Sequence, residues 1–432
     1  MFKKTILAII IGALCASTLV GCGAKTSTDS ATATKTPIKE VSLKFMGYKA
    51  GKEQGAIPDV ITKYQAANPN IKVEYEGISD SSNYTDVLKA RLASGGAADL
   101  FMVHNKQEAV TFSTGNYLSD LSSESWVSNM NTKLKDINVI NDKTYMLPLE
   151  MSGVCLIANK DLLAKNSIAN PTNWNEFMDA CAKLKAVNAT PLLLAMKTGW
   201  PALVYGMFAD GDISLTQPKL GADLVSGKIK ASDVYLPYMK KFQMVIDKGY
   251  TNGELSLGME FDNQGITEFV KGNAGFYIGG TWMIPQLKTA NANFNFDMIP
   301  FPINESGTSN AYIFPGANIA INAKSKNLDE AKKFLKFWSE DANGQLYTKS
   351  QAAFSPMKGG TSSDAPEVKI YGAAVSKGST VFGWNGQGDV NIDRDVVLTK
   401  WGEMAVSKKA GNISELGKQL NDAVTKGVAL KK

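Results

Sequence analysis

The chain carries few of the residue combinations that enzymes use for catalysis. It contains a single histidine, His104, which excludes every metal or catalytic motif that needs two. It has no Gly-x-Ser-x-Gly turn to present a nucleophilic serine. The stretch from Gly221 to Lys228 has the outline of a phosphate loop, but its glycines are spaced too widely and Ile229 stands where a hydroxyl residue is needed. We therefore expect no catalytic residues and no cofactor.

A late acidic stretch has the oxygen-ligand spacing of a calcium loop. Asp389, Asn391 and Asp393 alternate with other residues, and their side chains are of the kind that bind calcium. However, Arg394 occupies the position that needs glycine, and Lys400 the position that needs glutamate. The stretch therefore indicates a polar loop, and we expect no metal site in the chain.

The first 22 residues have the order of an export signal. A short positive start precedes an apolar run from Ile6 to Val20, which is shorter than the ~20 residues that a spanning helix needs. Leu-Val-Gly then precedes Cys22, as in the lipobox of bacterial lipoproteins. We expect residues 1–21 to be removed and the Cys22 thiol to carry acyl chains such as palmitate, because several chains together hold a protein at a membrane. An ordinary cleaved signal with an unrelated cysteine is the alternative.

The segment after Cys22 differs in composition from the rest. Residues 23–39 are nearly all Ala, Ser, Thr, Lys and Gly, and cannot bury enough apolar surface to offset the entropy of ordering. We expect a lipidated cysteine and flexible linker over 22–39. The body that follows has about 390 residues, more than a single core usually serves, so two domains are expected.

The charge of the chain argues against a nucleic-acid-binding protein, and its cysteines indicate free thiols. The formal net charge is +5, falling to +3 when Lys3 and Lys4 leave with the signal, and there is no Lys/Arg run, so no nucleic-acid partner is expected.

Only Cys155 and Cys181 lie in the folded body, one in an apolar run and one in a predicted helix. Two buried free thiols are expected; a disulfide is the alternative, because export permits one.

Strands and helices alternate in the first part of the body. Apolar residues alternate with polar ones in some runs and recur at helical spacing in others, which predicts βαβ units on a parallel sheet and hence an α/β fold. Asn173 with Glu176, and Asn327 with Glu330, each form the pattern of a capping box at a helix start. The predicted strands cover 41–45, 71–75, 100–103, 154–158 and 318–322, and the predicted helices 57–64, 84–92, 174–186 and 328–338.

One long stretch resembles a known family. Thr144 to Pro191 reads TYMLPLEMSGVCLIANKDLLAKNSIANPTNWNEFMDACAKLKAVNATP. It resembles the central signature of the extracellular solute-binding proteins of family 1, the maltose-binding-protein-like carbohydrate receptors of ABC importers. Three further stretches, 93–103, 268–282 and 318–358, resemble other parts of the family in the same order, so that the likeness runs through most of residues 41–425.

The resemblance implies a two-lobe periplasmic-binding-protein-like fold of type II, with discontinuous lobes around a ligand cleft. Its hinge crossings fall near 148–152, 315–318 and 358–360. Lobe one would then be 41–149 plus 317–358, and lobe two 150–316 plus 359–432. Closure of two such lobes around a ligand is a recognised hinge motion.

A carbohydrate site needs flat aromatic side chains for the apolar face of the sugar and fixed polar groups for its hydroxyls. The resemblance implies that Trp282, in a Gly-x-Trp motif, and Trp200, at a loop-to-helix junction, contact the ligand. Trp384 lies in a glycine-rich loop without a packing period and is a third candidate. Core or local packing roles are the alternatives, and they are the expectation for Trp174, Trp338 and Trp401.

The family's ligand contacts lie in loops at the carboxyl ends of strands. Among the candidates Glu150 is favoured, because charge-assisted hydrogen bonds to hydroxyls are strong. These loops differ from those of the well-known maltodextrin receptor, so maltose itself is not implied. The polar candidates are Tyr48, Lys49, His104, Asn105, Glu150, Ser152, Asp393 and Arg394.

The resemblance thus implies a monomeric receptor, lipid-anchored at the extracytoplasmic face of a bacterial membrane, that delivers a mono- or oligosaccharide to an ABC permease and its ATPase. Three candidate tryptophans and few arginines favour an uncharged sugar, because phosphate sites use arginine forks or helix N-termini. Alternatives are the same fold with a polyamine, phosphate ester, metal chelate or peptide, a structural adhesin, or a surface hydrolase whose acid–base pair forms only in the folded chain.

Overall fold

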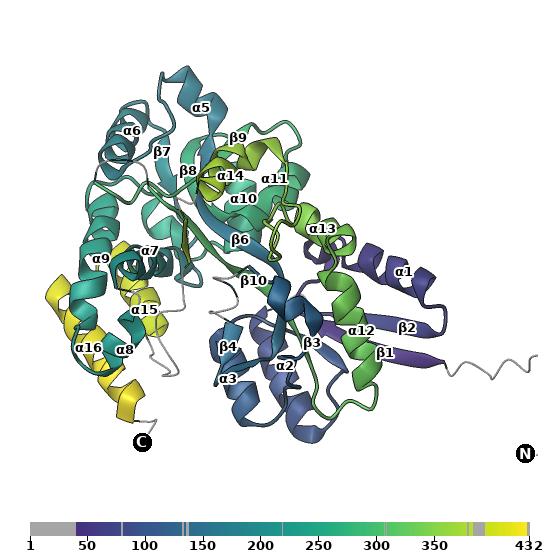
Figure 1. Ribbon diagram of the computed structural model, residues 1–432. Coiled ribbons are helices and arrows are strands. Elements are labelled where there is room, and N and C mark those ends of the chain that lie inside the picture. Colours follow the sequence, from purple (N-terminus) through teal and green to yellow (C-terminus); the bar gives the residue numbers. More distant parts are fainter. Residues whose placement is uncertain are drawn as a thin grey trace, which may run out of the picture. The chain divides into compact units, whose positions relative to one another are not determined.

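A computed structural model describes most of the chain from Glu40 onward (Figure 1). The polypeptide from Glu40 to Lys432 forms one compact unit. The predicted signal, Cys22 and the linker lie outside the described residues, as do Trp384 and the stretch from Asp389 to Asp393. No described helix is long and apolar enough to cross a membrane. The described residues are 40–78, 81–131, 134, 138–217, 219–305, 307, 309–377, 380–382 and 394–429.

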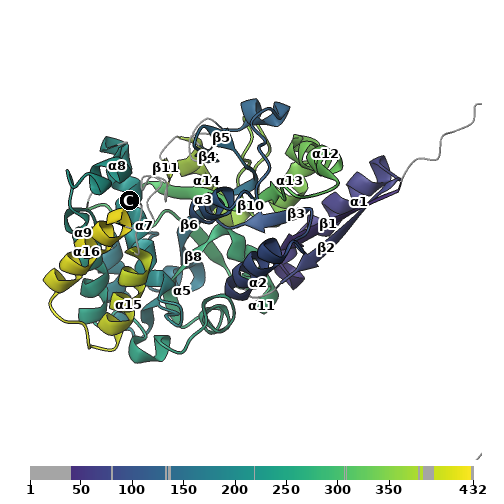
Figure 2. The ribbon, with the colours of Figure 1, turned by 90° about the horizontal axis from the view of Figure 1, so that it is seen from below.

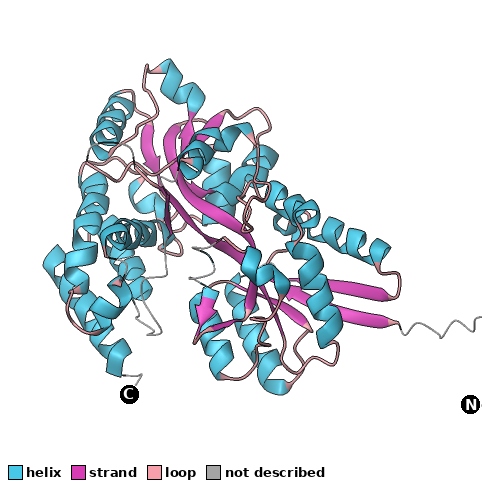
Figure 3. Cartoon of the chain, viewed as in Figure 1, coloured by secondary structure: helices cyan, strands magenta, loops and turns pink. Residues whose placement is uncertain are grey.

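The strands form one mixed sheet and a small separate hairpin (Figure 3). The strands are β1 Val41–Gly47, β2 Ile71–Gly77, β3 Leu100–Val103, β4 Val139–Ile140, β5 Lys143–Thr144, β6 Met146–Asn159, β7 Thr190–Leu193, β8 Ala274–Gly280, β9 Phe296–Ile299, β10 Ala311–Ile321 and β11 Thr380–Phe382. The order across the main sheet is β2-β1-β3-β10-β6-β8-β7. In addition β11 pairs with β10, β9 pairs with β6, and β4 with β5 makes the hairpin.

The helices lie between and after the strands in chain order. They are α1 Ile57–Ala67, α2 Ser81–Ser94, α3 Lys106–Thr114, α5 Lys160–Lys165, α6 Trp174–Ala186, α7 Trp200–Thr216, α8 Leu220–Val225, α9 Ala231–Asp247, α10 Ile266–Phe269, α11 Ile284–Ala290, α12 Leu328–Ser339, α13 Asp341–Ser350, α14 Lys369–Ser376, α15 Arg394–Val406 and α16 Ile413–Ala429. The last two pack against α7 and α9 (Figure 2).

The predicted βαβ units at the start of the body are confirmed. Strands β1, β2 and β3 pair in parallel, with α1 and α2 as the intervening helices. In β1 the side chains of Leu43 and Phe45 are buried while Ser42 and Lys44 are exposed, as alternation predicts. The four apolar positions of α1 that recur at helical spacing, from Ile57 to Tyr64, are all buried.

One of the two predicted capping boxes is wrong. At α6 the Asn173 side chain accepts a hydrogen bond from the Glu176 amide, as expected. At α12 the Asn327 side chain makes no cap; its amide group donates instead to Asp99 and to the backbone oxygen of Ser42. The tertiary contact with the neighbouring strand therefore outcompetes the local one.

Strands β6 and β10 are the longest and run antiparallel through the middle of the sheet (Figure 1). The far half of β10, from Asn318 to Ile321, pairs with β3, while its first residues pair with Ser152 to Val154. Their register shifts around Gly316, between Pro315 and Asn318. The pair thus joins the β1–β3 end of the sheet to the β7–β9 end through an irregular segment.

The buried apolar residues form three main clusters. The first combines residues of β1–β3 and the early helices with residues from Ala317 to Met357. The second and third are built chiefly from residues beyond Met151, one around α6, α7 and α9 and the other around β8 and β9. Trp338 lies in the first cluster and Trp174 and Trp401 in the second, which confirms their predicted packing roles.

Both cysteines of the folded body are free and buried. Cys155 lies in β6 and Cys181 in α6, which confirms the expectation of two buried thiols over a disulfide. Burial raises the pKa of each thiol well above its ordinary value. Neither is therefore a reactive thiolate at neutral pH.

Candidate functional site

The ends of β1 and β3 bring two predicted ligand residues together. Tyr48 follows β1, and its ring stacks on His104, which follows β3, with 3.9 Å between ring centroids and 15° between planes. The Tyr48 hydroxyl donates a hydrogen bond to the backbone oxygen of Gly316, at 3.0 Å. The carboxyl ends of two neighbouring parallel strands are thereby linked to the irregular segment of β10.

His104 is held by a carboxylate that the sequence analysis missed. Its Nδ1 lies 3.1 Å from the Glu108 Oε2, and its backbone NH donates to the same oxygen. Burial alone would raise the pKa of Glu108, but the hydrogen bonds and charge of His104 lower it below its ordinary value. With Nδ1 so occupied, the buried Nε2 of His104 has no partner among the described residues.

Asn105 has a structural role in the protein as it stands. Its side-chain oxygen accepts a hydrogen bond from the Glu108 amide and so caps the N-terminus of α3. The side-chain oxygen of this predicted ligand residue is thus already engaged. Asn105 helps to fix Glu108, which in turn orients His104.

Glu150 is a buried carboxyl group with one unpaired oxygen. The residue lies in β6 and is 2% exposed. Its Oε1 accepts a long hydrogen bond of 3.4 Å from the Ser152 hydroxyl, whereas Oε2 has no partner among the described residues. Burial raises the pKa of Glu150 to about 7, against the opposing effects of the Lys49 charge and the Ser152 hydroxyl. The Lys49 ammonium itself lies 5.6 Å from the centroid of the Tyr48 ring.

Gly316 is needed where β10 passes over Glu150. A Cβ atom at this position would collide with the Glu150 Oε1 and the Ser152 hydroxyl. The glycine therefore lets the backbone lie directly against these two side chains. Its oxygen accepts the Tyr48 hydroxyl on the same segment.

Four half-buried aromatic side chains gather beside this segment. The Trp200 ring lies 4.5 Å from Phe261 and 6.2 Å, nearly perpendicular, from Trp282. The Trp282 ring in turn lies 5.8 Å from Phe314. We call these four residues the aromatic cluster; all keep part of their surface exposed to solvent. The structure thus brings together Trp200 and Trp282, which the sequence analysis singled out separately.

The aromatic cluster and the polar residues meet at the β6–β10 pair. Phe314 is the register partner of Ser152. The Thr281 hydroxyl, next to Trp282, accepts a hydrogen bond from the backbone NH of Gly153. Ser152 and Glu150 are two residues apart on one strand and therefore share a face of it.

A π-helical turn places a second carboxylate near Lys49. The segment η4, Phe261–Gly265, is a single π turn, closed by the Gly265 amide on the Glu260 oxygen. Phe261 joins the aromatic cluster. The side chain of Asp262 keeps access to solvent, yet loss of solvation and the charge of Glu53 raise its pKa to about 6, while Lys49 opposes the shift. Such turns occur often at functional sites.

The late loop candidates lie at or beyond the limit of the described residues. Trp384 and Asp393 are outside them, and Arg394 opens α15 with a side chain that is not described. These three residues remain predictions. Among the described residues no group of three or more metal-ligating side chains comes together.

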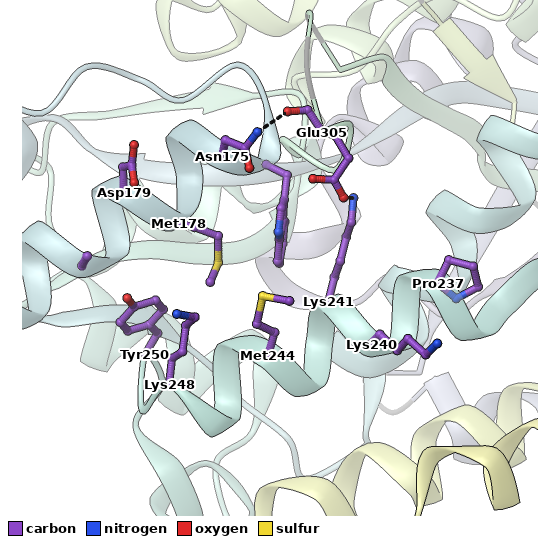
Figure 4. Close-up of a pocket in the computed structure, with 12 residues that line it drawn as sticks. Asn175, Met178, Asp179, Pro237, Lys240, Lys241, Met244, Lys248, Tyr250 and Glu305 are labelled. Carbon is purple, nitrogen blue, oxygen red and sulfur yellow. Dashed lines mark hydrogen bonds and ion pairs between the residues drawn. The ribbon is translucent and has the colours of Figure 1, made fainter.

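Two surface hollows are found in the described part of the chain. One, of about 620 Å³, lies between α6 and α9 and is lined by Trp174, Met178, Met244 and nine others (Figure 4). The Asn175 amide there donates to the Glu305 backbone oxygen, and Lys241 pairs with the Glu305 carboxylate. The other, of about 490 Å³, is lined by side chains such as Met259 and Asn263. Neither hollow is lined by a residue that the sequence analysis proposed as a ligand contact.

The Gly280→Ala substitution tests whether the position of the Trp282 ring matters for ligand binding. Gly280 lies beneath the indole, and an added Cβ would collide with three ring carbons. We expect the ring to be displaced, at a cost of about 1–3 kcal/mol in folding free energy. We expect the affinity for the predicted carbohydrate ligand to fall roughly tenfold or more. Titration calorimetry checks this, with Gly411→Ala as the control because a Cβ there meets open space. If Gly280→Ala bound the ligand with unchanged affinity, the Trp282 ring would not contribute to binding.

Comparison with known proteins defines the class of fold. The solved structure of the solute-binding protein RafE in complex with raffinose superposes with a TM-score of 0.73 at 18% identity, covering 89% of this chain and 99% of that one. Such a likeness between dissimilar sequences shows the fold. The predicted α/β, two-lobe fold of type II is thereby confirmed.

Similar sequences and a family model show to which family the chain belongs. The multiple sugar-binding protein of Streptococcus mutans is 24% identical over 71% of this chain and 73% of its own length. The melibiose/raffinose/stachyose-binding protein MelE of Bacillus subtilis is 23% identical over 76% and 75%. The model of the bacterial extracellular solute-binding proteins matches residues 50–345, more than half of the chain. The chain belongs to this family, and accordingly acts outside the cytoplasm.

Proposed function

We propose that the protein is the carbohydrate receptor of an ABC importer. The observation that carries this proposal is the aromatic cluster beside the buried, unpaired oxygen of Glu150. Exposed aromatic faces suit the apolar C–H face of a sugar ring, and a carboxylate suits its hydroxyls. Relatives whose names state that they bind multiple sugars, raffinose or stachyose support the same ligand class.

In this proposal the two groups of residues have separate roles. Trp282 and Trp200 stack on the ligand, with Phe261 and Phe314 completing the apolar wall. Glu150, Ser152 and His104 form hydrogen bonds to hydroxyls, with Tyr48 and Lys49 beside them. Trp384, Asp393 and Arg394 would contact the ligand from the late loop, while Asn105 acts through the cap of α3. The carboxylates of Glu150 and Asp262 argue for an uncharged sugar over an anionic one.

We also propose lobes of 41–149 plus 317–358 and 150–316 plus 359–432. The division of the buried clusters supports these boundaries, although Leu134, Ala352 and Phe354 pack with the cluster around β8. The irregular segment of β6 and β10 would be the hinge, with Tyr48 and Gly316 in contact across it. Ligand would then shift the population toward a closed state.

The remaining parts of the proposal concern the cell. The chain would be a monomer, anchored through acylated Cys22 at the extracytoplasmic face of a bacterial membrane. It would pass its sugar to a permease driven by an ATPase. It would bind its sugar without turnover, as the solute-binding family to which it belongs suggests.

Thermal unfolding of the Glu40–Lys432 unit against mono- and oligosaccharides tests the proposal. A sugar that binds only the folded chain, at 100 times its Kd, stabilises it by about 2.7 kcal/mol. For a chain of this size the midpoint should rise by roughly 3 °C. A shift with one class of glycan, and no change in the glycan after incubation, supports a receptor. Shifts with polyamines or phosphate esters alone would contradict the carbohydrate assignment, and cleaved glycan would contradict a pure binding role.

A further inference from the structure

The protonation state of Glu150 decides what this residue offers a ligand. Oε1 already accepts a hydrogen bond from Ser152, and Oε2 is the buried atom without a partner among the described residues. A proton on this carboxyl group would therefore reside on Oε2. It would turn that atom from an acceptor of hydrogen bonds into a donor. A sugar hydroxyl can pair with either form, because it both donates and accepts, but its hydrogen bond to the ionised form is charge-assisted and therefore stronger.

We propose that Glu150 binds sugar predominantly as an ionised carboxylate, accepting ligand hydroxyls at Oε2, so that binding of the sugar expels a proton. This inference rests on the proposed carbohydrate function. It adds that the receptor holds its ligand tightly at neutral to alkaline pH and releases it on acidification. It also adds that the ligand must present a hydroxyl donor at this position.

The surroundings of Glu150 explain why its ionisation and ligand binding are coupled. Lys49, after β1, is the one cation whose charge acts on Glu150 among the described residues. Ser152 of β6 donates to it, and Gly316 of β10 covers Oε1. From α13 the buried Tyr347 faces the same carboxylate, as does Tyr48. Hydroxyl groups of a ligand would supply the hydrogen bonds that this set does not provide.

The remaining charges near the site lie farther out. The charge of Glu53 raises the pKa of Tyr48, Tyr347 and Asp262. The charge of Glu108, which is paired with His104, also raises the pKa of Tyr48. Neither carboxylate contributes to the shifted pKa of Glu150, which arises from burial, the Lys49 charge and the Ser152 hydroxyl. Neutralising one of them is expected to leave the midpoint of the pH profile near its original value, whereas removing Glu150 is expected to abolish the profile.

The expected pH dependence follows from the populations of the two forms. The pKa of Glu150 in the free protein is raised to about 7. The apparent Kd equals the intrinsic Kd divided by the ionised fraction, which is about 0.9 at pH 8 and about 0.03 at pH 5.5. Affinity should therefore fall by up to about 30-fold between these values, and the fall should occur as pH drops through about 7.

Titration calorimetry at pH 5.5, 7 and 8 tests this. The probe is raffinose or, if raffinose gives no thermal shift, the panel sugar with the largest one. At pH 6.5 the titration is repeated in buffers of different ionisation enthalpy, which reports the proton released by the unaltered protein. We expect release of a substantial fraction of one proton, and a loss of affinity of up to about 30-fold in acid.

Glu150→Gln keeps the size of the side chain but cannot ionise. We expect it to bind more weakly at pH 8, with affinity that no longer depends on pH. His104→Asn and Asp262→Asn are the matched controls, which should change the affinity but retain its slope with pH. A flat profile and no proton release in the unaltered protein, or an unchanged slope in Glu150→Gln, would overturn the inference while leaving the sugar receptor intact. Failure of every sugar to bind at any pH would instead overturn the proposed function.

Discussion

Replacing Trp282 with alanine is expected to weaken sugar binding by roughly 100-fold or more. The indole lies in the aromatic cluster, perpendicular to both Trp200 and Phe314, and it keeps exposed surface. In the proposed site it provides the flat face on which a sugar ring stacks. Truncation of a central aromatic anchor that costs about 3–4 kcal/mol corresponds to some two to three orders of magnitude in Kd. Titration calorimetry with the best sugar of the panel measures this loss.

Two further variants control for loss of structure. Trp282→Phe keeps a smaller aromatic face and should retain part of the affinity. Trp338→Phe alters a tryptophan of the first buried cluster, and should lower thermal stability with little change in affinity. Wild-type affinity in folded Trp282→Ala would show that sugar does not stack on this ring.

Replacing Glu150 with glutamine is expected to stabilise the free protein at alkaline pH. Burial raises the pKa of Glu150 from 4.5 to about 7, so the folded state favours the neutral group. The stability due to this preference is fully present below pH 4.5 and is lost as pH rises through about 7. By pH 8 the folded chain carries a buried charge that costs about 3 kcal/mol. Glutamine carries no charge and avoids this cost.

Thermal unfolding at two pH values measures the effect. At pH 8 the midpoint of Glu150→Gln should lie roughly 3–4 °C above that of the unaltered protein, and near pH 4.5 the two should agree. A variant that is less stable at pH 8, or equally changed at both values, would contradict a buried carboxylate of raised pKa. A gain in stability together with weaker sugar binding is the trade-off expected of a residue kept for function.

The regular elements were predictable because their signals are local. Alternation in β1, the periodic face of α1 and the cap at Asn173 each depend on residues close in sequence. The predicted cap at Asn327 was wrong because Asp99, distant in sequence, binds that side chain instead. Local patterns therefore predict elements well, but not which tertiary contacts override them.

The candidate site was predictable only in part. Trp282 and Glu150 stood out through the family resemblance, although nothing local indicated that Glu150 would be buried with an unpaired oxygen. Phe261 and Asp262 were missed because a single π turn has no periodic pattern. Phe314 was missed for another reason: it lies in a strand, and its contact with Trp282 exists only because β10 pairs with β6.

A crystal structure of the Glu40–Lys432 unit with the best-binding sugar tests the central claim most directly. If the aromatic cluster and Glu150 form the carbohydrate site, a sugar ring should stack on Trp282, and a hydroxyl should lie within hydrogen-bond distance of the Glu150 Oε2. A sugar bound instead in the hollow between α6 and α9, with Trp282 and Glu150 free of contact, would contradict the account.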